Sequence, residues 1–142
     1  MIIMKKKVIA TIVFALGGFF MFSMVSGFKA SVTNDPWVVP DVAKNKRNPV
    51  ASDAQTIATG KALYSTHCKS CHGTKGLGDG SKAAQLKTEP GDFSKAVFQA
   101  QTDGSLFYKT SEGRDDMPSF KKKIPDEDDR WSVVNFMRTL KK

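Results

Sequence analysis

The feature that most constrains this chain is a five-residue stretch, Cys68-Lys69-Ser70-Cys71-His72. Two thiols three residues apart lie on one helical turn, and an imidazole follows the second thiol directly. This spacing is the one that attaches a c-type haem. The two sulfurs can reach the two vinyl groups on one side of a porphyrin, while His72 lies beneath the ring as a ligand to iron. The stretch therefore predicts covalent attachment through Cys68 and Cys71, and an iron ligand in His72.

Other uses of these residues fit the sequence less well. A structural zinc ion takes four Cys or His ligands in a tetrahedron, but the available Cys and His residues are too close in sequence to surround one metal. A thioredoxin-like dithiol lies near a βαβ pattern, and no convincing strand run is nearby. A plain disulfide leaves His72 without a role. A dithiol, a disulfide and a metal site remain as the minor alternatives to haem attachment.

The length and composition predict one small domain with extensions. A chain of 142 residues, of which 40% are hydrophobic, buries a limited core. A large, flat, apolar cofactor would supply part of that core. We expect an export signal or transmembrane anchor over residues 1–28, an extended linker over 29–51 and the globular domain over 52–142.

The N-terminal residues have the pattern of an export segment. Three lysines, Lys5 to Lys7, precede an uncharged run over residues 8–28. This run is longer than the roughly 7 to 15 residues of a signal-peptide core and close to the roughly 20 that span a bilayer. Its length favours a retained anchor, although the small residues around Ser26 also suit cleavage. Either outcome places the domain on the outer face of the cytoplasmic membrane or in the periplasm, and we favour the tethered form.

The segment after the apolar run has the composition of a linker. It contains Pro36, Pro40 and Pro49, several charges and little periodicity. We expect it to be extended, so that it holds the domain tens of Å from the bilayer if the anchor is retained. Trp37 within it is interpreted as a side chain packed on the domain surface, in preference to an anchor for a partner.

The remaining sequence predicts an all-α domain. One helix should begin at Ser52 or Asp53 and run into the haem motif, with a close helix crossing at Gly60. A short helical turn is expected within residues 81–86, and a further helix from Thr102 or Asp103 to near Gly113. The last helix starts at Asp126, and its apolar face repeats every third residue, at Trp131, Val134, Met137 and Leu140.

Met117 is the candidate for a second iron ligand. A thioether is a soft ligand, and Met opposite His is a known haem pairing that raises the reduction potential. The other methionines lie in the export segment or, for Met137, in the last helix. Pro118 stiffens the loop that holds the sulfur. We expect His67, directly before the first thiol, to project away from this second ligand position.

With these residues in place, the chain resembles the class I monohaem cytochromes c over residues 52–142. The resemblance rests on four pieces: the Cys68-x-x-Cys71-His72 motif, residues 90–93 (Pro-Gly-Asp-Phe), residues 113–120 around Met117, and a C-terminal helix that bears Trp131. It implies an all-α cytochrome c-like fold, in which the N- and C-terminal helices cross around one covalently bound haem c with an exposed edge. It also implies that the Pro90 carbonyl accepts a hydrogen bond from the free nitrogen of His72.

The expected function is electron transfer. If His72 and Met117 fill both axial positions, no iron site remains open for oxygen or peroxide, so the protein is expected to be an electron carrier and not an enzyme. A haem subunit fixed in a larger respiratory complex is the main alternative, and a haem-based ligand sensor or enzyme is a weaker one.

The charge suggests the partners. The net charge is +8, and several lysines flank the motifs that should surround the haem: Lys69, Lys75, Lys82 and Lys121 to Lys123. Basic residues around an exposed haem edge would steer it toward acidic docking surfaces, although a merely soluble basic surface explains them equally well. We expect a quinol-oxidising complex or dehydrogenase as donor and a terminal oxidase as acceptor, and no nucleic acid.

Overall fold

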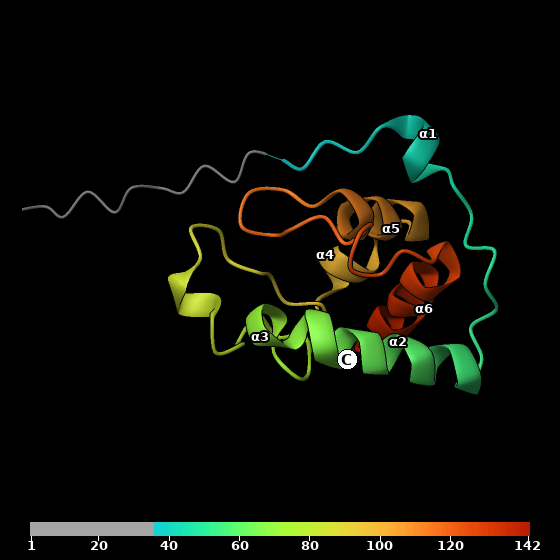
Figure 1. The fold of residues 1–142 in the computed structure, drawn as a ribbon. Coiled ribbons are helices and arrows are strands. Elements are labelled where there is room, and N and C mark those ends of the chain that lie inside the picture. Colours follow the sequence, from blue (N-terminus) through green and yellow to red (C-terminus); the bar gives the residue numbers. More distant parts are fainter. Residues whose placement is uncertain (1–35) are drawn as a thin grey trace, which may run out of the picture. The chain divides into compact units, whose positions relative to one another are not determined.

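The computed structural model describes residues 36–142, so the predicted export segment over residues 8–28 lies outside them. This part of the chain is helical (Figure 1). Residues 36–142 form no strand, and their isolated β-bridge joins Arg114 and Met117. The all-α prediction is confirmed. None of the helices in residues 36–142 is long and apolar enough to cross a membrane. The elements are α1 (Asp41–Lys44), α2 (Ala54–His67), α3 (Lys69–His72), the 3-10 turn η1 (Ala83–Gln85), α4 (Ala96–Gln99), α5 (Asp103–Glu112) and α6 (Glu127–Arg138).

Helix α2 begins at the predicted cap. The Asp53 carboxylate accepts a hydrogen bond from the Thr56 backbone N–H at 2.9 Å, and the Thr56 hydroxyl accepts one from the Asp53 N–H at 3.2 Å. This reciprocal pair satisfies two backbone donors that the first turn leaves unpaired. The helix then runs without interruption to the first thiol, which fixes the haem motif to a long, rigid element.

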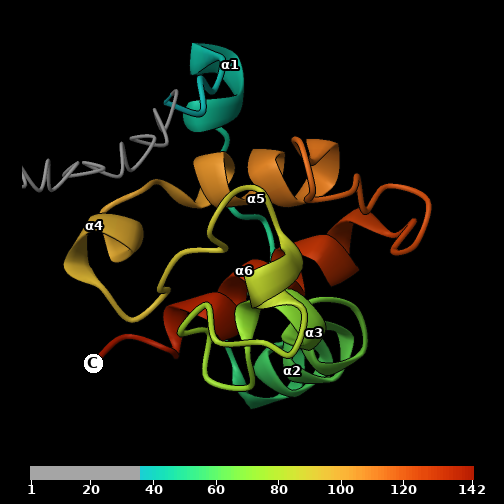
Figure 2. The same cartoon turned by 90° about the vertical axis from the view of Figure 1, so that its left-hand side faces the viewer.

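The predicted crossing at Gly60 is confirmed. A Cβ atom placed on Gly60 would lie 1.9 Å from the backbone carbonyl oxygen of Ser132 in α6. Only glycine permits so close an approach of the two backbones. Figures 1 and 2 show α6 packed beside α2.

The core lies between α2, α5 and α6. Trp131 and Val134 of α6 are fully buried, and the Trp131 ring stacks on Phe107 of α5 with 3.9 Å between ring centroids. Tyr64 of α2 is buried in the same core, 5.1 Å from the Phe136 ring. The three-residue apolar repeat of the last helix therefore faces inward, as its spacing predicts.

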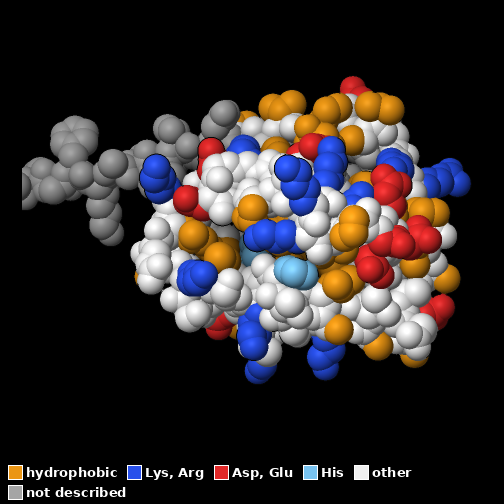
Figure 3. Space-filling view, viewed as in Figure 1, with side chains coloured by type: hydrophobic (Ala, Val, Ile, Leu, Met, Phe, Trp, Pro, Cys, Tyr) orange, Lys and Arg blue, Asp and Glu red, His pale blue; other side chains and the backbone are white. Residues whose placement is uncertain are grey.

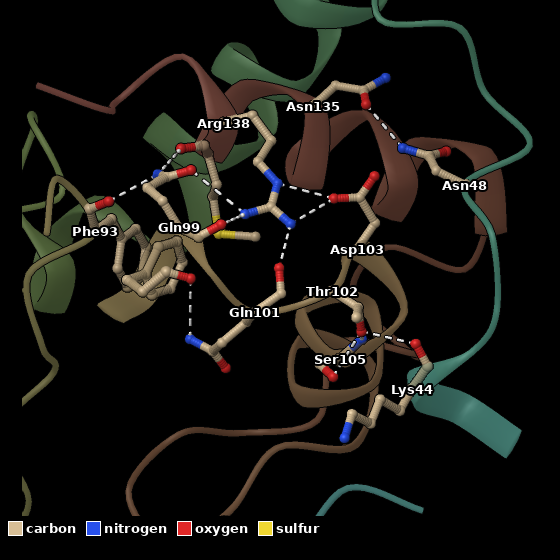
Figure 4. Close-up of polar contacts among 12 residues, drawn as sticks. Lys44, Asn48, Phe93, Gln99, Gln101, Thr102, Asp103, Ser105, Asn135 and Arg138 are labelled. Atoms are coloured by element: carbon tan, nitrogen blue, oxygen red, sulfur yellow. Dashed lines mark hydrogen bonds and ion pairs between the residues drawn. The ribbon is translucent and has the colours of Figure 1, made fainter. Parts of the chain in front are cut away.

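The segment predicted as an extended linker differs from that prediction from Pro36 onward. It forms the short helix α1 and lies on α5, where a Cβ on Gly104 would be 2.2 Å from the Ala43 carbonyl oxygen. The Thr102 hydroxyl donates to the Lys44 carbonyl at 2.7 Å, and the Asn48 amide donates to Asn135 at 2.8 Å (Figure 4). Its prolines and charges predict a free linker, but its backbone carbonyls accept hydrogen bonds from side chains of the domain.

Arg138, near the end of α6, ties the helix to the loop around α4. Its guanidinium donates to the Asp103 carboxylate at 2.6 Å and to the carbonyls of Gln99 at 2.9 Å and Gln101 at 2.6 Å (Figure 4). These charge-assisted bonds converge on one planar side chain. They hold the loop that connects the Pro90 region to α5, and so help to shape one wall of the site.

Candidate haem site

A single cavity of about 580 Å³ brings the predicted site residues together. Cys68, Cys71, His72, Pro90 and Met117 all line it. Its volume lies within the range of roughly 300 to 1,000 Å³ that is typical of cofactor and ligand sites. The two predicted iron ligands, His72 and Met117, are 45 residues apart in the sequence but meet at one cavity.

The two thiols lie where α2 gives way to α3. Cys68 is buried at the junction of the two helices, Cys71 is in α3, and both are free. Burial raises the pKa of the Cys68 thiol to about 12, and the nearby Cys71 adds to this effect. A redox-active dithiol depends on a lowered thiol pKa, so this environment does not favour the dithiol alternative.

His72 is held as a neutral imidazole. Burial lowers its pKa to about 4, and the Pro90 carbonyl partly opposes this effect. A neutral imidazole has a free nitrogen lone pair, the form that ligates metals. The Phe93 ring packs against the imidazole with 4.6 Å between centroids. The Nδ1 atom, however, is buried without a hydrogen-bond partner. The Pro90 carbonyl acts on the His72 pKa as a hydrogen-bond acceptor would, although no full hydrogen bond forms at Nδ1, so the contact that the resemblance implies stays a prediction.

The loop after His72 wraps back onto the haem motif. The N–H of Gly78 donates to the His72 carbonyl at 2.9 Å, and the Tyr64 hydroxyl donates to the Gly73 carbonyl at 2.8 Å. The buried Tyr64 side chain therefore connects α2 to this loop. The loop passes so close to α3 that a Cβ on Gly80 would lie 2.6 Å from the Cys71 carbonyl oxygen. The backbone around the imidazole is fixed from two sides.

The loop that carries Met117 is closed by its own backbone. Arg114 and Met117 exchange two hydrogen bonds, and Gly113 before them has a φ of +71°. Ser119, beyond Met117, donates its hydroxyl to the Ser111 carbonyl at 2.6 Å. Both ends of the loop are therefore anchored to α5, and the partly buried Met117 side chain lies at the cavity.

Two residues that sequence reasoning did not assign to the site also line the cavity. His67 lies there with its ring 6.2 Å from that of Phe120, although we expected it to project away from the Met117 side. Trp37, from the segment interpreted as a linker, forms another part of the wall. The sequence offered one signal for Trp37, a large aromatic residue within a polar, proline-rich stretch.

The charges around the cavity are mixed. Three acidic residues and two basic ones line it: Glu89, Asp115, Asp116, Lys109 and Arg114. The lysines expected to surround the haem are exposed, but Lys121 forms an ion pair with Glu112 at 2.6 Å. Figure 3 shows a histidine and hydrophobic side chains on this face, between lysine and arginine side chains. The excess of basic residues therefore lies on the surface around the cavity, whereas the residues that line the cavity are mixed in charge.

The donor set fits a haem c. The cavity is mainly apolar at Leu86, Val97 and Phe120, as a porphyrin requires, and it gathers two free thiols, a neutral imidazole and a thioether. Thiols suit covalent attachment, whereas imidazole and thioether suit axial ligation. No group of three or more His, Cys, Asp or Glu side chains in residues 36–142 could hold a separate metal ion.

Comparison with known proteins agrees with this assignment. Residues 55–137, more than half of the chain, match the family model of cytochrome c oxidase, cbb3-type, subunit III. No curated protein matches the chain.

The solved structures that are similar to the chain include the following two. One is a chain of the Kuenenia stuttgartiensis reducing HAO-like protein complex Kustc0457/Kustc0458, with a TM-score of 0.61 and 28% identity over 66% of this chain and 47% of that one. The other is the c-type cytochrome KustC0563, with a TM-score of 0.50 and 30% identity over 58% of this chain and 98% of that one. This chain therefore spans about half the length of the first neighbour and nearly all of the second. The fold, the motif and the family match together establish that the chain belongs to the cbb3-type cytochrome c oxidase subunit III family and is a class I cytochrome c.

Proposed function

We propose that this protein carries single electrons through one haem c, attached by Cys68 and Cys71 and ligated by His72 and Met117. The observation that carries the proposal is the cavity. Both thiols, the His72 imidazole and the Met117 thioether line it together, and Met117 is the only methionine among the described residues that does so. When bound, haem c supplies a one-electron couple, and a His/Met pair raises its potential.

The chain's own residues prepare the site for this role. The buried environment of His72 keeps its imidazole neutral, so no proton has to leave before it can act as a ligand. The backbone pairing of Arg114 with Met117 fixes the loop that presents the thioether. Because both ligands come from backbone-anchored segments, little rearrangement is needed when the charge of the site changes.

The proposed partners are other redox proteins. We propose a quinol-oxidising complex or a dehydrogenase as donor and a terminal oxidase as acceptor. The net charge of +8 and the exposed Lys69, Lys75 and Lys82 support an acidic docking surface on the partner. A higher ionic strength should therefore lower the association rate of the two proteins.

The proposed location is outside the cytoplasm, with the apolar run at 8–28 retained as an anchor. The support is the sequence pattern of three lysines followed by that run. Finding the N-terminus of the mature protein by mass spectrometry tests this directly. An N-terminus before residue 8 supports the anchor, whereas one near residue 28 contradicts it. The same spectrum of denatured protein reports whether one haem remains covalently attached.

A second candidate is a haem subunit fixed in a larger complex. The similarity to a chain of the reducing HAO-like complex favours it, because that neighbour works within an assembly. Copurification separates the two candidates. A carrier leaves the membrane extract as a single chain after detergent solubilisation, whereas a fixed subunit retains other chains at constant ratio.

Carbon monoxide tests the coordination that the carrier function requires. The reduced, haem-loaded full chain should bind carbon monoxide slowly or not at all, since both axial positions are filled by the protein. Rapid binding by the wild type would show an open iron position. That result would overturn the carrier proposal in favour of a ligand sensor or an enzyme.

A further inference from the structure

The segment from Pro36 to Ala51, here called the arm, is part of the folded domain. Its backbone lies directly on the start of α5, where a Cβ on Gly104 would come within 2.6 Å of the Lys46 carbonyl oxygen. Thr102, the cap of α5, donates its hydroxyl to the Lys44 carbonyl at 2.7 Å (Figure 4). The absence of a side chain at Gly104 is what allows this contact.

The far end of the arm is held by α6. The buried Asn135 amide accepts a hydrogen bond from Asn48 at 2.8 Å and donates one to the Ala51 carbonyl at 3.1 Å. Lys46 lies over the Phe107 ring, 4.8 Å from its centroid, and forms an ion pair with Glu127 at 3.3 Å. Contacts to both α5 and α6 fix the direction in which the arm leaves the domain.

That direction brings Trp37 to the Met117 side of the cavity. The Arg114 guanidinium lies 4.8 Å from the Trp37 ring centroid and the Lys109 ammonium 5.5 Å from it. Both distances are within the range of a cation–π contact. Trp37, Arg114 and Lys109 all line the cavity, and Lys109 donates to Gln101 at 2.5 Å.

Arg114 connects this aromatic contact to the proposed iron ligand. Its side chain lies against Trp37, while its backbone exchanges hydrogen bonds of 2.8 and 2.9 Å with Met117. Burial and the neighbouring Arg114 charge both lower the pKa of Lys109. The Trp37 ring therefore contacts the loop that holds Met117 through the Arg114 side chain.

From this arrangement we infer that Trp37 is a positioning residue that holds the Met117 loop against the cavity and limits the access of small ligands to the iron position. The inference rests on the proposed His72/Met117 ligation. It assigns a role in the site to a residue far outside the haem motif. The valines of the arm do not share it, because Val38 and Val42 are 79% and 83% exposed and do not line the cavity.

The test compares four variants of the full, haem-loaded chain. Trp37→Ala removes the ring, and Trp37→Phe keeps a ring face for the two cations. Gly104→Ala displaces the arm without touching the cavity. Val42→Ala changes the arm at an exposed position and serves as the matched control. The probe is carbon monoxide mixed with the reduced protein, far below the unfolding transition, and the reduction potential is measured on the same samples.

Loss of two cation–π contacts should raise the carbon monoxide binding rate roughly tenfold in Trp37→Ala. Gly104→Ala should behave in the same way, Trp37→Phe should recover most of the wild-type rate, and Val42→Ala should match the wild type. A merely structural role would lower the unfolding free energy without changing the binding rate or the potential.

The outcomes separate this inference from the proposed function. If the wild type itself binds carbon monoxide rapidly, the proposed function fails. If the wild type is closed, and both Trp37→Ala and Gly104→Ala remain equally closed with unchanged potentials, the role of Trp37 is refuted while the His72/Met117 site stands.

Discussion

Arg114 and Met117 pair through their backbones, with the Arg114 N–H donating to the Met117 carbonyl at 2.8 Å and the Met117 N–H donating to the Arg114 carbonyl at 2.9 Å. The loop that presents the thioether is thereby closed before any cofactor contact is made. It begins at Gly113, whose φ of +71° turns the chain out of α5. The position of the sulfur thus depends on a backbone geometry that few substitutions at Gly113 can preserve.

Replacement of Gly113 by alanine should disrupt this loop. The new Cβ would lie 2.4 Å from the Met117 carbonyl oxygen, and the residue would also be forced into a left-handed conformation. We expect a loss of at least about 3 kcal/mol in the free energy of unfolding. Denaturant titration measures the loss, and the optical spectrum of the haem-loaded variant reports whether Met117 still reaches its position.

Gly91→Ala is the matched control, because Gly91 has a similar φ of +76° but nothing within 4 Å of the added Cβ. It should lose only the conformational part, about 1 to 2 kcal/mol. Equal losses in the two variants would mean that the contact with Met117 contributes nothing.

The crossing of α2 and α6 should be equally intolerant of a side chain at Gly60. Alanine gains about 1 kcal/mol in helix propensity, but its Cβ would meet the Ser132 carbonyl oxygen at 1.9 Å and force the helices apart. We expect a net loss of about 2 kcal/mol in the free energy of unfolding, measured by denaturant titration. The exposed neighbour variant Lys61→Ala should stay within about 0.5 kcal/mol of the wild type. A Gly60→Ala protein more stable than the wild type would rule out the close crossing.

The cap of α2 gives the fold a defined sensitivity to acid. Hydrogen bonding, first of all from the Thr56 N–H, lowers the pKa of Asp53 in the folded state. A lowered folded pKa means that the stabilisation is complete above the unfolded pKa of about 4 and is lost as the pH falls through the folded value. Asp53→Asn keeps a good cap that does not titrate. The stability difference between wild type and variant should therefore change below about pH 4 and stay constant from pH 5 to 8. A constant difference down to pH 2 would contradict this assignment.

Much of the fold follows from local signals that need no tertiary information. Asp53, Thr102 and Asp126 are side chains that cap helices through their own oxygen atoms, and each begins a helix where the sequence predicts one. Gly60 predicts the crossing, because a glycine inside a helix costs stability and is favoured where another backbone approaches closely. The cavity likewise gathers Cys68, Cys71, His72 and Met117, the residues that the motif and the soft-ligand argument selected.

The arm could not be predicted in this way. Its contacts depend on partners distant in sequence. Gly104 leaves room for the arm's backbone carbonyls, and Asn135 donates a hydrogen bond to the Ala51 carbonyl. No residue pattern within the arm indicates these partners. The helix α4 is only four residues long, too short for a periodic signal. The place of His67 in the cavity wall depends on the end of α2, where small changes in backbone direction decide which way a side chain points.

The central claim, ligation by Met117, is tested most directly by the reduction potential of Met117→Leu in the haem-loaded protein. Leucine keeps the size of the side chain and removes the sulfur, and Met137→Leu, in the core of α6, is the matched control. Axial ligands set haem potentials over a span of about 0.8 V, and Met raises them. We predict that the potential of Met117→Leu falls by on the order of 100 mV, even if the His67 imidazole replaces the thioether, while that of Met137→Leu stays unchanged. A potential and spectrum in Met117→Leu identical to those of the wild type would contradict the assignment.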